Sequence, residues 1–105
     1  MPYILPESRN TLNHHIDELA EAIVKESGKN ENYFAGLMNY AFTRTALKVV
    51  KSKYGRMHYW ILAMLVGIFI TIVLEIFRRL GGPYEDKQIK KNGDVDIIDE
   101  FLRDM

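Results

Sequence analysis

Residues 57–80, MHYWILAMLVGIFITIVLEIFRRL, form the segment that decides the fold of this chain. Residues 59–74 within it carry no charge and are apolar on every side of a helix. That pattern is typical of the centre of a helical bundle or of a membrane span. Gly81, Gly82 and Pro83 follow directly, and such a run continues a helix poorly. We therefore expect a central apolar helix that spans residues 57–80 and ends there.

Two amphipathic helices are predicted before this segment. The first covers residues 6–27, and its apolar stripe at helical spacing consists of Leu12, Ile16, Leu19 and Ile23. The second covers residues 33–53 after a cap at Asn32, and its stripe consists of Phe34, Met38, Phe42, Ala46, Val49 and Val50. Both stripes have to be buried, and a helix that is apolar on every side offers the matching surface.

The stretch GGPYEDKQIKKNGDVD, residues 81–96, predicts an ordered strap after the central helix. Tyr84 can anchor this strap on the bundle. Glu85 and Asp86 would then face basic side chains such as Arg44. We expect the strap to fasten the bundle or to close over a ligand.

A short helix is predicted over residues 96–104, after a turn. Asn92 and Gly93 both accept a positive φ, which makes the pair a strong turn signal. Asp94 or Asp96 can cap the helix that follows. Its apolar residues recur at helical spacing and predict a docking face: Ile97, Ile98, Phe101 and Leu102.

Composition limits the classes of function. The 14 basic and 14 acidic residues give a formal net charge of +0, so no net field attracts nucleic acid. The chain has no cysteine, which excludes disulfides, thiolate nucleophiles and cysteine-based zinc sites. A chain of 105 residues makes one domain with a modest core, so self-association through the central helix is expected.

A membrane span is the alternative interpretation of the central helix. Residues 59–77 reach the length of a spanning helix if Glu75 lies near one interface. Tyr59 and Trp60 would suit an aromatic belt at the other interface. Basic residues flank both ends of the run, so the positive-inside rule gives no orientation.

Three motifs carry a resemblance to a known family. They are NYAFTR at residues 39–44, LEIFRR at residues 74–79 and GPYEDKQIKKNGDV at residues 82–95. The chain resembles a family of short uncharacterised bacterial and bacteriophage proteins with N-Y-x-x-[TS]-R, L-E-F-Y-R-R-like and P-Y-E-D-x-x-I-x-x-N-G-D-V motifs. The resemblance implies a soluble helical protein and no particular activity. Ile70 and Val73 stand where that family has polar residues, so the central helix of this chain is more apolar than the matching helix of the family.

Catalytic and metal-binding patterns are weak. His14 and His15 are adjacent and point about 100° apart on a helix, so they cannot grip one metal ion together. His14 and Glu18 have ligand spacing, but two ligands make no site. The serines and threonines lie in no nucleophile elbow, and no phosphate-binding glycine loop is present. We expect a protein that is not an enzyme and that has no metal and no cofactor.

A polar file on the second helix is the strongest candidate site. Asn39 and Thr43 are four residues apart, as are Tyr40 and Arg44, so they cluster on adjoining faces. In one interpretation Arg44 pairs internally with Glu75 or another acid, within a structural network of Glu75, Glu85, Asp86 and Asp94. In the other interpretation the file binds an anionic ligand.

The ligand hypothesis distributes roles over eight residues. It assigns charge to Arg44, Arg78 and Arg79, stacking to Tyr40 and Tyr84, and hydrogen bonds to Asn39, Thr43 and Asn92. The expected protein is a small, soluble, cytoplasmic three-helix bundle with a C-terminal strap, which self-associates and sequesters a nucleotide-like anion at a subunit junction. A phage-encoded protein would work in the host cytoplasm. A single-span membrane protein and a structural or protein-interaction module remain the alternatives.

Overall fold

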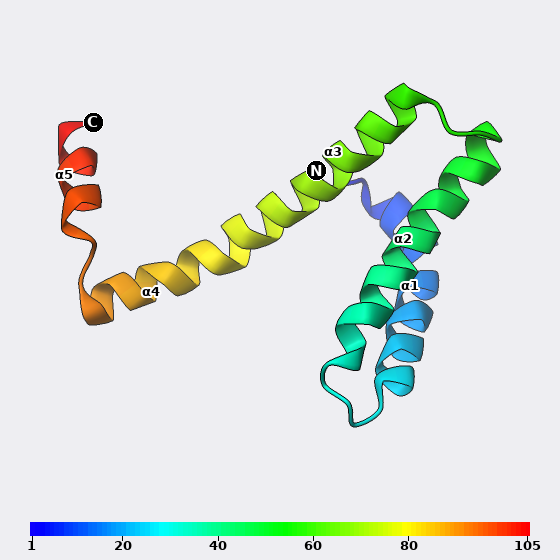
Figure 1. The fold of residues 1–105 in the computed structure, drawn as a ribbon, viewed down its shortest axis with the longest axis horizontal. Coiled ribbons are helices and arrows are strands. Elements are labelled where there is room, and N and C mark those ends of the chain that lie inside the picture. Colours follow the sequence, from blue (N-terminus) through cyan, green and yellow to red (C-terminus); the bar gives the residue numbers. More distant parts are fainter. The chain divides into compact units, whose positions relative to one another are not determined.

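The computed structural model describes all residues, 1–105, and contains helices only. In order they are α1 (Pro6–Ser27), α2 (Tyr33–Tyr54), α3 (Tyr59–Ile76), a π-helical turn η1 (Phe77–Gly81), α4 (Gly82–Asn92) and α5 (Asp96–Asp104) (Figure 1). The predicted all-α fold is confirmed. The predicted bounds of α1 and α5 match, and α2 ends one residue later than predicted. The chain divides into two compact units, Met1–Gly67 and Ile68–Met105.

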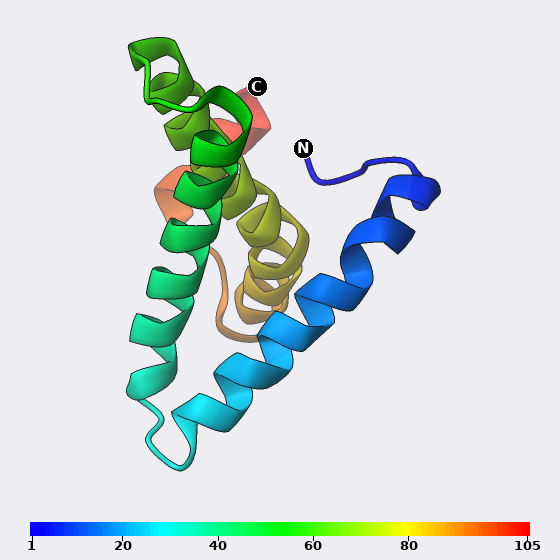
Figure 2. The ribbon, with the colours of Figure 1, turned by 90° about the vertical axis from the view of Figure 1, so that its right-hand side faces the viewer.

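In the first unit, α1 and α2 form a hairpin that is closed at its turn and opens away from it (Figure 2). Pro6 occupies the first turn of α1, where its missing N–H costs no hydrogen bond. Gly28 ends the helix with a φ of 55°, a left-handed conformation that suits glycine. Because the two helices diverge, their facing apolar residues leave a space between them.

The connection from α2 to α3 holds the only two buried side chains of the chain, Val50 and Ile61. Gly55 turns the chain with a φ of 79° and donates its N–H to the Lys51 carbonyl at 3.0 Å. Tyr54 and Trp60 meet edge to face across the turn, with ring centroids 5.4 Å apart. Buried side chains, a hydrogen bond and a ring contact therefore all stabilise the corner between α2 and α3.

The predicted end of the central helix and the predicted strap are wrong. Gly81, Gly82 and Pro83 do not stop the helix, which runs without a break from Tyr59 to Asn92. The amide of Gly82 bonds to the carbonyl of Phe77, five residues back, so one wider turn precedes Pro83. A π turn of this kind shifts the preceding carbonyls and lets the proline ring follow without ending the helix.

The glycine at residue 81 makes this turn possible. A Cβ added there would lie 2.9 Å from Cδ2 of Phe77, so the ring of Phe77 occupies the space that a side chain would fill. Tyr84, expected to anchor a strap, instead lies on α4 with 64 % of its surface exposed. The helix ends only at Gly93, whose φ is 89° and whose N–H bonds to the Ile89 carbonyl.

The α3 segment remains largely bare. Only 6 % of its most apolar 18-residue window is buried, and that window has a mean hydropathy of 2.6. Ile70 and Val73, for example, are 53 % and 65 % exposed. By length and composition this helix could cross a membrane, although the core helix of an assembly has the same properties.

Candidate functional site

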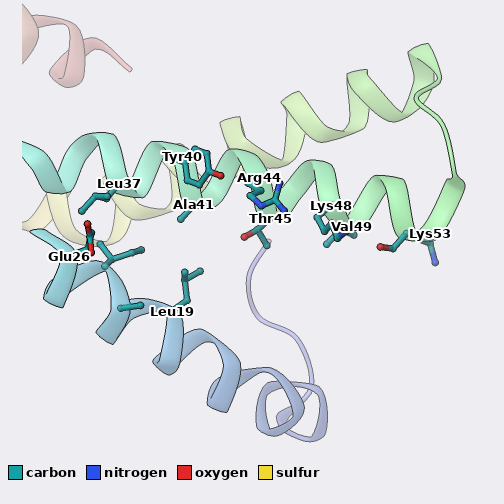
Figure 3. Close-up of a pocket in the computed structure, with 13 residues that line it drawn as sticks. Leu19, Glu26, Leu37, Tyr40, Ala41, Arg44, Thr45, Lys48, Val49 and Lys53 are labelled. Carbon is teal, nitrogen blue, oxygen red and sulfur yellow. The ribbon is translucent and has the colours of Figure 1, made fainter.

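A groove between α1 and α2 has a volume of about 900 Å³. Its floor is apolar and comes from both helices: Leu19 and Ile23 of α1, and Leu37, Ala41 and Val49 of α2 (Figure 3). It exists because α1 and α2 separate away from their turn. The side chains that would meet in a tighter hairpin here line an open space.

Basic side chains of α2 line the groove beside this floor. They are Arg44, Lys48 and Lys53, and the only carboxylate in the lining is Glu26 of α1. All four residues are exposed, and the three cations form no ion pair. Lys53 instead lies over the Tyr54 ring, 5.7 Å from its centroid. The groove thus combines an apolar floor with an excess of positive charge.

The members of the predicted polar file line neighbouring hollows along α2, and Tyr40, Thr43 and Arg44 share one of about 410 Å³. Tyr40 and Arg44 line the groove, whereas Asn39 and Thr43 do not. Thr43 Oγ1 donates to Asn39 Oδ1 at 3.5 Å, and with Tyr40 these two line a shallower hollow of about 550 Å³. The groove therefore retains one charged and one aromatic member of the predicted file.

A family model described as "Domain of unknown function (DUF6899)" matches residues 1–95. The chain belongs to this family. No curated protein and no solved structure matches it. The matched DUF6899 region contains α1, α2, α3, η1 and α4, and it ends before α5. The candidate groove therefore lies wholly within the DUF6899 region.

The other four predicted ligand residues belong to the second unit of the chain. Arg78 and Arg79 lie on η1, and Tyr84 and Asn92 lie on α4. Asn92 Nδ2 donates to Gln88 Oε1 at 3.4 Å, one helical turn earlier. The structure thus brings Tyr40 and Arg44 into one groove and leaves these four residues in a different compact unit of the DUF6899 chain.

The predicted internal pairing of Arg44 with Glu75 stays a prediction, because the two residues belong to different compact units of the chain. Glu75 accepts two hydrogen bonds from Arg78, at 2.6 Å from Nη2 and 3.4 Å from Nε. A residue three positions along the same helix reaches this carboxylate without any tertiary contact. Glu85 and Asp86 are exposed on α4 and form no ion pair within their unit.

Asp94 does not cap α5 in the predicted way. Its Oδ1 accepts a bond from the N–H of the next residue, Val95, at 2.7 Å. Val95 itself is the N-cap residue, and no side chain caps the helix. Asp96 likewise accepts from the adjacent Ile97.

Sequence reasoning missed Lys48, Lys53 and Glu26 as members of the site. Lys48 follows Arg44 by four residues, so the two lie on the same face of α2, and that spacing was a usable signal. We had interpreted the lysines only as charges that flank the apolar helix. Glu26 comes from α1, and nothing local in the sequence pairs it with α2.

No metal centre is formed. The structure has no group of three or more histidine and carboxylate side chains that could hold an ion. His14 Nε2 lies 2.6 Å from Glu18 Oε1, so the spacing noted in the sequence produces an exposed side-chain pair on α1.

Proposed function

We propose that the protein is a non-enzymatic binding protein that holds a small amphiphilic anion in the groove between α1 and α2. One observation carries the proposal: an apolar groove of about 900 Å³ is lined by three cations that form no ion pair. Small-molecule sites are typically concavities of roughly 300–1,000 Å³, mostly apolar, with a few polar groups that fix orientation. The groove has this size and this mixture of side chains.

The chemistry of the lining defines the ligand class. The Arg44 guanidinium is a planar fork that can donate two parallel hydrogen bonds to a phosphate or carboxylate. Lys48 and Lys53 add point charges that suit a second anionic group. Tyr40 offers an aromatic face, and the aliphatic floor takes a ring or a chain. A nucleotide satisfies these features with its base and phosphates, and an acyl anion satisfies them with its chain and head group.

The proposal includes self-association through the central helix, and it includes the bacterial or bacteriophage origin that the sequence resemblance implies. The bare apolar surface of α3 supports association of copies, because monomeric soluble proteins rarely expose contiguous apolar patches of more than a few hundred Å². Sequestration of a host nucleotide by a phage protein would fit a small binding protein with no catalytic constellation.

Thermal shift and calorimetry with two ligand panels test the function. One panel holds nucleotides and cyclic dinucleotides, and the other holds acyl phosphates and carboxylates. We expect a compound from one panel to bind. We also expect Arg44→Ala and Lys48→Ala to weaken that binding about tenfold or more while the melting temperature of the free protein stays unchanged. Lys90→Ala, on α4, is the matched control and should bind as the parent does. Failure of both panels would refute the proposal.

A second candidate is a single-span membrane protein with residues 59–77 in lipid. The specific observation that favours it is the 6 % burial of a window with a mean hydropathy of 2.6. Nineteen helical residues extend about 28 Å, close to the hydrocarbon thickness of a bilayer. Expression without detergent separates the candidates, because a soluble, monodisperse oligomer would rule out the membrane function.

A further inference from the structure

The C-terminal helix α5 has a complete division between apolar and acidic faces. Four large apolar residues occupy one side and are each 49–65 % exposed: Ile97, Ile98, Phe101 and Leu102. The other side carries four carboxylates and one cation: Asp96, Asp99, Glu100, Asp104 and Arg103. The cation is already engaged, since Arg103 Nε lies 3.5 Å from Asp99 Oδ2. This helix is acidic overall and has nothing on its apolar side.

The groove between α1 and α2 has the complementary properties. Its floor is aliphatic, and Arg44, Lys48 and Lys53 outnumber the single carboxylate Glu26. Amphipathic helices commonly bind in this manner, with anchors at three- and four-residue spacing laid into an apolar groove. A helix of nine residues is about 14 Å long, and α2 extends about 24 Å between Leu37 and Lys53. The groove therefore has length enough for α5.

We propose that α5 of a second copy of the chain occupies this groove in the ligand-free protein and that the anionic ligand displaces it. This proposal rests on the function proposed above, because the ligand and α5 compete for the same cations. The carboxylates of α5 take the place of the ligand's anionic group beside Arg44 and Lys48. Phe101 and its apolar neighbours take the place of the ligand's ring or chain.

Charge selects this groove over the other apolar concavity of the hairpin. That second groove, of about 620 Å³, is lined by Phe34, Met38 and Phe42. Its only charged lining residues are Lys29 and Glu31. Its charges balance, so it offers α5 no electrostatic advantage. In the groove between α1 and α2, by contrast, both faces of α5 meet a complementary surface.

The connection between the groove and α5 favours a second copy as the source. From Tyr59 to Asn92 the chain is one unbroken helix of 34 residues, which corresponds to a length of about 50 Å. The groove residues precede the near end of this helix in the chain, and α5 follows its far end. The DUF6899 match ends at residue 95, so α5 is an element additional to the matched region.

The absence of cysteine allows a direct test by disulfide trapping in the full chain. Two singly substituted proteins are mixed, Ala41→Cys in the groove and Leu102→Cys on α5. We expect them to form a mixed disulfide dimer at least ten times faster than Glu21→Cys, on α1 outside the groove lining, mixed with Leu102→Cys. Equal rates for the two mixtures would overturn the proposal. A cross-linked monomer from the double variant Ala41→Cys/Leu102→Cys would show docking within one chain and would also overturn it.

Ligand binding separates this proposal from the proposed function. In Phe101→Ser/Leu102→Ser, α5 loses its anchors, and we expect the compound identified by the panels to bind about tenfold more tightly if α5 fills nine grooves in ten. Unchanged affinity, together with equal trapping rates, would refute α5 docking and leave the binding function standing. A second outcome is that α5 is trapped at the groove but no compound binds, even to this variant. That outcome would refute the binding function, and with it the displacement of α5 by a ligand. The control variant Glu21→Ser should behave as the parent does in both measurements.

Discussion

Arg78 Nη2 lies 2.6 Å from Glu75 Oε1, across the boundary where the α-helical turn of α3 becomes the π turn η1. The Glu75 side chain is 22 % exposed and that of Arg78 is 67 % exposed. The pair is local, and it ties the last turn of α3 to the widened turn. Arg44 lies in the other compact unit, where it lines the groove between α1 and α2.

Glu75→Gln should therefore be slightly more destabilising than Arg44→Ala. An ion pair at three- or four-residue spacing on a helix contributes about 0.2–0.5 kcal/mol to the free energy of unfolding, whereas Arg44 has no partner to lose. Urea unfolding at low and high salt measures both effects, and high salt should remove the cost of Glu75→Gln. A larger loss for Arg44→Ala would instead support the internal network of Arg44 with Glu75 or another acid.

Gly81→Ala should change the sign of its effect when the Phe77 ring is removed. In the parent chain the added Cβ would lie 2.9 Å from Phe77 Cδ2, so the ring has to move and the stability falls. In a Phe77→Ala background the space is free, and replacing a helical glycine by alanine should stabilise by about 0.5–1 kcal/mol. Unfolding of the four variants measures the coupling. Purely additive effects of the two substitutions would show that the Phe77 ring does not occupy the space that a side chain at residue 81 needs.

Ile61→Ala should be among the most destabilising single substitutions in the first unit. Ile61 is only 3 % exposed at the α2–α3 corner, and removing a buried isoleucine side chain costs about 2–5 kcal/mol. Val24→Ala, at a position that is 71 % exposed, is the matched control and should cost much less. Comparable losses for the two variants, measured by denaturant unfolding, would mean that the corner is not a packed core.

Ile70→Asn should reduce association of the chain. Ile70 is 53 % exposed on α3. An asparagine at a copy-to-copy contact would leave its amide buried without a partner, so we expect a lower average mass in analytical ultracentrifugation. Lys90→Asn, on α4, serves as the control. An unchanged mass would place the association surface elsewhere.

Helical periodicity predicted most of the fold, because each helix has its own apolar spacing. The stripe from Leu12 to Ile23 and the glycine at residue 28 were enough to bound α1. The same reasoning failed at Pro83, because the rule that glycine and proline end a helix assumes an α-helical turn before them. At the π turn the Phe77 ring occupies the space that a side chain at Gly81 would fill, a relationship that no propensity scale contains.

The candidate site could be predicted only in part for a similar reason. Tyr40 and Arg44 share a face of one helix, and their four-residue spacing reveals that face. The groove also needs Leu19 and Glu26 of α1, and their approach depends on how far the hairpin opens. Spacing along one helix carries no information about that angle.

Val50 and Ile61 are the whole buried core of a chain of 105 residues. Ordering a residue costs about 1–2 kcal/mol of conformational entropy at 25 °C, and apolar burial is the main term that offsets it. A core of two fully buried side chains is small for four helices, and in the proposed association the bare surface of α3 gains cover from a second copy. Folding and association would then be a single event, and dilution should unfold the protein as well as separate its copies.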